Sequence, residues 1–361
     1  MKPIRSSDFS TSSESSSPTS AREAKPIRPP DSKKNKTAAV IAVVGLVFAI
    51  GVGLLYGPTA IPVPELLYHL LHPGKGVVST IIFDIRLPRV LAAALVGGSL
   101  AESGLIMQAL LRNPLADPYV IGASSGAGLG ATIAQVFFPA VDMIAPAAFL
   151  GALGAVFTAY TLARGRGRTE MFTIILAGYA ISILLGAITA FLMVWHAADL
   201  SSIFAWELGG IHGMDWGHLL MAACLTIIGL SFTVPFIPEL NAFLLGEEQA
   251  GYLGIKVERI RFILLAAASL MTAGAVYLSG LVGFVGLVVP HVLRRLVGPH
   301  HRHLVPLSFV TGAAFLVLAD ALAENLPGIG VIPLGIVTAL VGGPYFLWLL
   351  SRSTSDRQWS I

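Results

Sequence analysis

Long apolar runs separated by short polar connections make up most of this chain. Seven runs come close to the roughly 20 apolar residues that a helix needs to cross a membrane, and they span residues 38–56, 90–111, 143–163, 171–195, 219–236, 262–278 and 333–350. A Gly/Ala-rich stretch and two further apolar segments raise the prediction to about ten spans: 118–138, 282–297 and 304–323. Backbone polar groups in lipid must be satisfied within their own segment, so the spans are predicted to be helices and the fold class to be all-α.

The composition agrees with an integral membrane protein. The 361 residues are 55% hydrophobic and 12% charged, with a mean hydropathy of +0.78, whereas a typical soluble domain has about 25% charged residues. The single cysteine, Cys224, lies in an apolar run, so an intrachain disulfide is excluded and redox chemistry is not expected. The chain is therefore predicted to function within the membrane.

The positions of lysine and arginine predict the orientation of the spans. With the N-terminus inside and an even number of spans, only Lys75, Arg86 and Arg89 of the 23 Lys and Arg residues lie outside. Basic residues concentrate on the cytoplasmic side of membrane proteins. Both termini are accordingly predicted to be cytoplasmic.

The two ends of the chain differ in composition from the spans. Residues 1–36 are rich in Ser, Pro, Lys and Arg and predict a disordered cytoplasmic tail, whose basic end lies against anionic lipid headgroups. Residues 37–352 form the predicted transmembrane domain, and 353–361 a short C-terminal tail. A cleaved signal peptide is disfavoured, because the first apolar run is long and no small-residue cleavage site follows it.

A series of short motifs occurs in a fixed order from Arg86 to Thr338. They include RLPR at 86–89, GGSLA at 97–101, NPLADP at 113–118, GASSGA at 122–127, LGE at 245–247, VGFVGLVVPH at 282–291 and PLGIVT at 333–338. In this order the chain resembles the permease subunits of bacterial ATP-binding-cassette importers for iron siderophores, haem and cobalamin. The resemblance implies the type II importer fold. In that fold each subunit has ten helices with inverted-repeat character, two subunits enclose a central path, two ATPase subunits lie beneath, and a binding protein lies above.

The inner segment 241–258 has the pattern of two short amphipathic helices broken at glycine. Such a helix suits a groove in a partner protein, and an interfacial helix resting on headgroups fits the same pattern. The resemblance favours docking in a partner groove, because the matching segment of the family docks on the ATPase. It implies coupling roles for Gly246, Glu247, Ala250, Leu253 and Gly254.

A proline-locked hairpin, Arg112 to Pro118, joins two spans on the predicted inner side. Proline fixes its own backbone dihedral and bars its predecessor from helical geometry, and a stiff turn at membrane depth requires water or protein beside it. The resemblance implies an inner gate at Asn113, Pro114 and Leu115, which meet their copies from the second subunit. A plain connecting turn is the alternative.

Arg86 and Arg89 are the main basic residues on the predicted outer side. The resemblance implies that they receive acidic residues of the binding protein, a charge-steered contact that weakens with salt. Interfacial arginines that snorkel toward the headgroups are the alternative. Glu324 departs from the family pattern, which usually has an outward-facing arginine there, so one docking contact is in doubt and the partner's charges are expected to differ accordingly.

Two polar residues within a span, Glu102 and Gln108, are candidates for the translocation path. Charges within spans are unfavourable and usually functional. Glu102 either faces the central path or pairs with a neighbour such as Gln108, and the sequence leaves both possibilities open. Asp320 is expected to form a structural hydrogen bond near the outer end of its span.

Other motifs argue against ligand chemistry on this chain. Its glycine clusters lack the Gly-x-x-x-x-Gly-Lys-Ser/Thr loop of nucleotide-binding proteins and are predicted to pack helices together. The histidines at 291, 300, 301 and 303 lie among arginines and read as a basic inner loop rather than a metal site. We expect no cofactor on this chain, with ATP and Mg bound by the partner ATPase, and no nucleic-acid partner.

Together these features predict a non-catalytic, multi-pass membrane subunit in the bacterial plasma membrane. It would import an iron chelate (ferric siderophore or haem) or cobalamin by alternating access, as a homodimer with ATPase and binding-protein partners. An ion-coupled carrier or channel without an ATPase is the alternative, with Glu102 and Asp320 as its intramembrane charges. A membrane enzyme would require clustered His, Asp, Ser or Cys near the spans.

Overall fold

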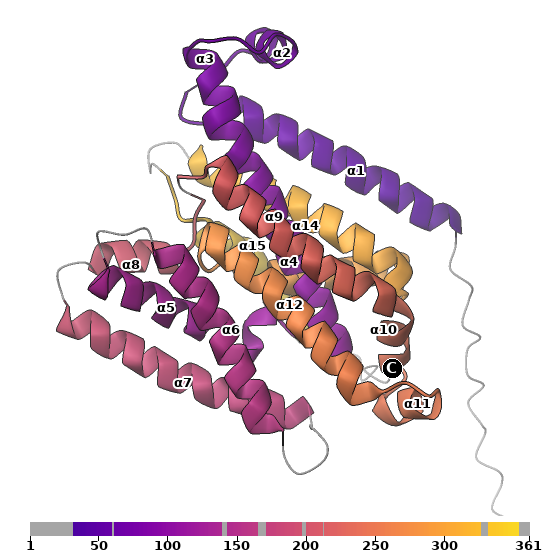
Figure 1. The fold of residues 1–361 in the computed structure, drawn as a ribbon. Helices are drawn as coiled ribbons and strands as arrows, with labels where there is room; N and C mark the ends of the chain where they lie inside the picture. The colour runs from indigo at the N-terminus through magenta and orange to yellow at the C-terminus, as the bar shows by residue number, and fades with distance from the viewer. Residues whose placement is uncertain are drawn as a thin grey trace, which may run out of the picture.

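The computed structural model is a bundle of helices (Figure 1) and describes residues 32–59, 61–138, 143–164, 171–196, 200–211, 213–325 and 331–353. No strand occurs within these ranges. Residues 1–31 and 354–361, which make up most of the two predicted tails, lie outside these ranges. So do Arg166 and Arg168, two of the basic residues that the orientation prediction places on the inner side. Residues 32–36 were predicted to be part of the disordered tail, but they form the start of a helix.

Each of the ten predicted spans falls on a helix. The ten are α1 Ser32–Leu55, α4 Leu87–Leu110, α5 Ala123–Phe137, α6 Ile144–Ala163, α7 Met171–Trp195, α9 Trp216–Thr233, α12 Val257–Ser279, α13 Val285–Val297, α14 His301–Glu324 and α15 Leu334–Ser353. Among the described residues, 7 helices are long and apolar enough to cross a membrane, while α5 and α13 are shorter, with 15 and 13 residues. The predicted all-α membrane class is confirmed.

Short helices occupy the connections between the long ones. They are α2 Val63–Leu71, α3 Val77–Thr80, η1 Ile81–Arg86, η2 Pro118–Ile121, α8 Leu200–Glu207, η4 Val234–Phe236, α10 Ile237–Phe243 and α11 Glu247–Tyr252. Figure 1 shows α2 and α3 at one end of the bundle and α10 and α11 at the other. The bundle therefore has two structured ends, and we call the α10–α11 end the inner end and the other the outer end.

Helix α4 is the centre of the bundle. It lies against α9, α12, α13 and α14, and 83% of its most apolar window is buried, compared with 17% for α1 and 22% for α7. Its sequence explains this position, because Ala, Gly and Ser dominate the stretch from Ala92 to Gly104. Small side chains let neighbouring helices approach α4 on several faces.

Glycine pairs set the closest approaches between helices. A Cβ added to Gly97 of α4 would collide with the carbonyl oxygen of Gly312 of α14, and the reverse is also true. Gly126 of α5 and Gly151 of α6 have the same reciprocal relationship. The prediction that the glycine cluster around Gly126 packs helices is therefore confirmed.

We predict that Gly97→Val destabilises the protein by at least about 1–3 kcal/mol, because the added side chain must push α14 away from α4. Gly45→Val in α1 is the matched control, since a Cβ there meets nothing within 4 Å. Thermal unfolding of the purified protein in detergent measures both variants. Equal melting temperatures for Gly97→Val and the parent would contradict this packing.

Candidate functional site

The connection between α9 and α12 folds into two short helices, as the pattern of segment 241–258 predicts. Helix α11 is bounded by Gly246 and Gly254, with φ angles of +117° and +80°. Residues with side chains rarely adopt such angles, so glycine is required for both turns. The chain thereby holds α11 as a separate helical turn at the inner end.

The inner end presents apolar side chains to its surroundings. Ala250 is fully buried on the inward face of α11, whereas Leu245, Tyr252 and Leu253 are 60%, 88% and 66% exposed. We call these three exposed residues the coupling surface. Exposed apolar groups clustered on one short segment are typical of a docking surface for another protein. The coupling roles expected of Ala250 and Leu253 stay predictions, with Ala250 placed beneath the surface and Leu253 on it.

A buried arginine joins α11 to α12. Arg261 is 1% exposed and forms ion pairs with Glu247 of α11 and, at 3.0 Å, with Glu258 of its own helix. An arginine buried in this way is held by its acidic partners, because an unpaired buried charge is strongly unfavourable. The ion pair with Glu247 therefore links α11 directly to α12. Nothing in the sequence indicated that Arg261 is buried or that it pairs with Glu247.

A second buried link joins α10 to α14. The Asn241 side-chain oxygen accepts a 2.9 Å hydrogen bond from the His301 backbone N–H and lies 2.9 Å from His301 Nδ1. His301 is fully buried, unlike the basic loop residue expected from the sequence. Among the described residues, no group of three or more His, Cys, Asp or Glu could hold a metal ion.

The predicted gate hairpin is a rigid turn next to α11. Asn113 Oδ1 accepts a 2.9 Å hydrogen bond from the Leu115 N–H, and Arg112 has a φ of +48°. Arg112 Nη1 lies 3.5 Å from the position that a Cβ on Gly246 would occupy. The hairpin and the coupling segment, far apart in sequence, are thus neighbours, while gating by Asn113, Pro114 and Leu115 stays a prediction.

Asp117 ends the hairpin and caps η2, where its Oδ1 accepts a 2.9 Å hydrogen bond from the Tyr119 N–H. Burial raises the pKa of Asp117 to about 6, and the bond from Tyr119 opposes this rise. The side chain retains some exposed area, so the carboxylate is only partly removed from water. Its main role in this turn is to fix the start of η2.

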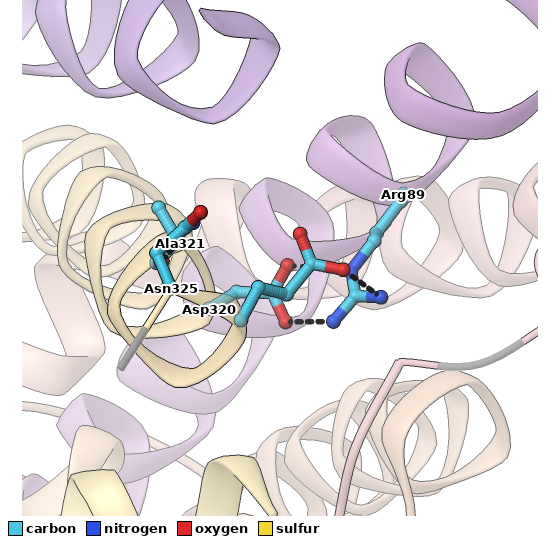
Figure 2. Close-up of polar contacts among 5 residues, drawn as sticks. Arg89, Asp320, Ala321 and Asn325 are labelled. Carbon is cyan, nitrogen blue, oxygen red and sulfur yellow. Dashed lines mark hydrogen bonds and ion pairs between the residues drawn. The ribbon is translucent and has the colours of Figure 1, made fainter. Parts of the chain in front are cut away.

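At the outer end, Arg89 joins α4 to α14 (Figure 2). Its Nε and Nη2 lie 2.8 and 2.9 Å from the two carboxylate oxygens of Asp320, and its Nη1 lies 2.5 Å from Glu324 Oε1. Next to this cluster, Asn325 Nδ2 donates a 2.7 Å hydrogen bond to the Ala321 carbonyl. The forked pairing of Arg89 with Asp320 is the strong, geometrically specific kind. We call Arg89, Asp320 and Glu324 the outer clasp.

Arg86 turns into the protein instead of outward. It is 6% exposed, and its guanidinium donates to the carbonyls of Leu54, Leu55 and Thr59, at 2.6 and 3.0 Å for the first two. The bonds to Leu54 and Leu55 satisfy carbonyls at the end of α1 that have no helical donor, and the bond to Thr59 holds the loop that follows. Docking of a binding protein by Arg86, Arg89 and Glu324 stays a prediction, and in this conformation both arginines are occupied by internal acceptors.

Glu102 and Gln108 do not pair with each other. Gln108 Nε2 donates to the carbonyls of Gly286 and Leu287 of α13, both at 3.2 Å. Pro290 explains this contact, because it lacks the N–H that would otherwise bond to the Gly286 carbonyl one turn earlier. Glu102 is fully buried, and neither of its carboxylate oxygens has a hydrogen-bond partner among the described residues. Pairing with Gln108, one of the two possibilities that the sequence left open for Glu102, is therefore not formed in this structure.

We predict that Arg89→Gln destabilises the protein by about 3–5 kcal/mol, because it leaves two carboxylates close together without their partner. Combining it with Asp320→Asn and Glu324→Gln should recover most of the loss. Thermal unfolding in detergent checks both variants, with the exposed Arg302→Gln as control. If Arg89→Gln alone had the same melting temperature as the parent, the outer clasp would add nothing to stability.

Comparison with known proteins agrees with this architecture. The FecCD transport family matches residues 45–352. The cobalamin import system permease protein BtuC of Halobacterium salinarum is 42% identical, covering 87% of this chain and 88% of its own. The hemin transport system permease protein HmuU of Yersinia pestis is 40% identical, covering 76% and 84%.

A solved structure shows the same fold. It is an ABC transporter of the metal-chelate type in an inward-facing conformation, with a TM-score of 0.78 and 30% identity over 89% of this chain and 99% of that one. The match to the FecCD family begins within α1 and ends within α15, so it includes the hairpin, the coupling surface and the outer clasp. The chain is therefore a multi-pass membrane permease that belongs to the FecCD transport family.

Proposed function

We propose that this chain is the translocation subunit of an ATP-driven importer. Two copies enclose the path, a separate pair of ATPase subunits hydrolyses ATP, and a binding protein delivers the substrate at the outer end. The proposed substrate is cobalamin or an iron chelate such as haem or a ferric siderophore. The names of the cobalamin and hemin relatives support this class, as does the metal-chelate transporter of the same fold.

The coupling surface is the observation that carries the proposal. Leu245, Tyr252 and Leu253 are exposed on or directly beside α11, a helix that is too short to be stable alone. The surrounding glycine turns and the buried Arg261 hold that helix in place. A rigid, exposed apolar segment at one end of a permease is suited to bind in a groove of a partner protein, which could then move it.

The contacts suggest how force would spread from the ATPase. Displacement of α11 acts on α12 through Glu247 and Arg261, and displacement of α10 acts on α14 through Asn241 and His301. Helix α14 reaches the outer clasp at its other end. In the proposed cycle, tilting of α12 and α14 about α4 opens one end while it closes the other, which is a shear between packed helices.

The proposed contact between α11 and the ATPase also determines the orientation of the chain in the membrane. The ATPase side must be cytoplasmic, so α10, α11 and both termini are placed there, with the outer clasp facing the binding protein. Because Glu324 adds a negative charge to the clasp, we propose a docking lobe that carries a basic residue opposite it. Opposite charges across an interface set the register of docking.

An ion-coupled carrier is the second candidate, and the buried carboxyl of Glu102 is the observation that favours it. A buried ionisable group without a partner is a functional candidate by default. Such a carrier would transport without an ATPase, so uphill uptake by vesicles that contain this polypeptide alone would support it and refute the ATP-driven importer.

We predict that Leu253→Asp abolishes copurification with the cognate ATPase subunit, weakening the complex by at least about tenfold, because an apolar anchor at the centre of an interface becomes charged. Gly254→Pro should act similarly, since proline cannot adopt the +80° φ of this turn. Leu71→Asp, which changes a similarly exposed leucine on α2 at the outer end, is the control. Undiminished copurification of Leu253→Asp would refute the coupling assignment.

A further inference from the structure

An apolar groove opens on the lateral surface of the bundle, along the boundary between α6 and α12. Its volume is about 690 Å³, which falls within the roughly 300–1,000 Å³ of small-molecule sites. Helices α6, α7, α9 and α12 all contribute to its walls, which include Leu153, Phe157, Tyr160, Phe232, Phe262 and Leu270. In a membrane protein a lateral groove of this kind faces lipid unless another chain covers it.

An aromatic pair marks one end of the groove. The rings of Tyr160 in α6 and Phe262 in α12 are 5.2 Å apart between centroids and tilted by 51°. Tyr160 lies near the end of α6, and Phe262 lies near the start of α12, directly after the ion-paired Arg261. This end of the groove is therefore the inner end of the bundle.

Two arginines stand just beyond the aromatic pair. Arg164 follows Tyr160 by one turn, and its backbone N–H donates a 3.0 Å hydrogen bond to the Tyr160 carbonyl. Arg259 precedes Phe262 by three residues on α12, and residues at this spacing share a helix face. Both arginines are exposed. The groove thus has an apolar body and, at its inner end, a cationic mouth formed by Arg164 and Arg259.

We propose that this groove binds an anionic phospholipid. An acyl chain would lie between α6 and α12, and the phosphate would contact Arg164 and Arg259. Guanidinium groups bind phosphate oxygens in a bidentate manner, and basic pockets between membrane helices on the cytoplasmic side bind lipid headgroups. The assignment to the inner leaflet rests on the proposed orientation, whereas the binding itself does not.

The combination of an apolar groove and two arginines at its inner end favours an anionic phospholipid over a zwitterionic lipid or a second copy of this chain. A zwitterionic lipid could fill the apolar body, but it carries no net charge for the two arginines. A second copy of this chain would have to place acidic groups at the inner mouth and apolar side chains in the body. A bound anionic lipid would touch α12, so it would also reach the helix that Arg261 links to α11.

The first test removes the cationic mouth. Native mass spectrometry of the full chain in detergent, titrated with phosphatidylglycerol or phosphatidylcholine of the same acyl chains, should show preferential retention of phosphatidylglycerol. The double variant Arg164→Gln/Arg259→Gln should bind phosphatidylglycerol about tenfold more weakly than the parent does. Its affinity for phosphatidylglycerol should then be close to its affinity for phosphatidylcholine. Arg302→Gln removes an exposed arginine from α14, which does not line the groove, and should change nothing.

The second test fills the apolar body. Gly154 lines the groove, and a Cβ there meets nothing within 4 Å, so Gly154→Leu projects into the groove without moving the backbone. It should lower the affinity for both lipids, whereas Gly45→Leu on α1, where a Cβ also meets nothing within 4 Å, should not. Melting temperatures in lipid-free detergent establish that each variant is folded.

Three results would overturn the proposal. The first is equal affinity of the parent for the two lipids, and the second is unchanged phosphatidylglycerol binding by both the arginine variant and Gly154→Leu. The third is disulfide cross-linking of two copies through Gly154→Cys in a Cys224→Ser background, which would identify the groove as a subunit interface. None of these results bears on copurification with the ATPase, so this proposal and the proposed function can fail separately.

Discussion

The close approach of other helices to α4 is the constraint on which this architecture depends. In lipid, helices gain little from hydrophobic burial against one another, so packing and hydrogen bonds must hold the bundle together. Gly97 and Gly312 bring α4 against α14, and Gly104 brings it against Gly286 of α13. At such distances side chains also reach backbone carbonyls of the neighbours, as Ser103 does at Ala268 of α12, 3.0 Å away. One small-residue helix thereby organises the helices around it.

Around this centre, further polar links lie at the two ends of the bundle. The outer clasp joins α4 to α14, while the inner links join α10 to α14 and α11 to α12. Helix α14 takes part at both ends, and α12 begins at the coupling segment. A bundle that is tightly packed in the middle and linked by charge at its ends can transmit a displacement along its helices. The proposed importer mechanism uses this property, with the ATPase acting on α11.

The sequence predicted the helices well because most spans are long, nearly uncharged runs whose length is set by the membrane. It also predicted the broken helix at Gly246 and Gly254, since glycine at a turn leaves a local signal. It did not predict the partners of Arg261 and His301, because those partners come from other segments that only the fold brings together. For a related reason the sequence left open whether Glu102 pairs with Gln108: the missing N–H of Pro290, in a distant helix, gives Gln108 a different partner.

Transport by a reconstituted complex tests the central claim most directly. Proteoliposomes that contain this chain, its ATPase and its binding protein would be compared with the same vesicles carrying Arg261→Gln. If the buried ion pair carries motion from α11 to α12, the variant complex should assemble and hydrolyse ATP while substrate uptake falls by about tenfold or more. Uptake equal to that of the parent, at the same rate of ATP hydrolysis, would contradict the account.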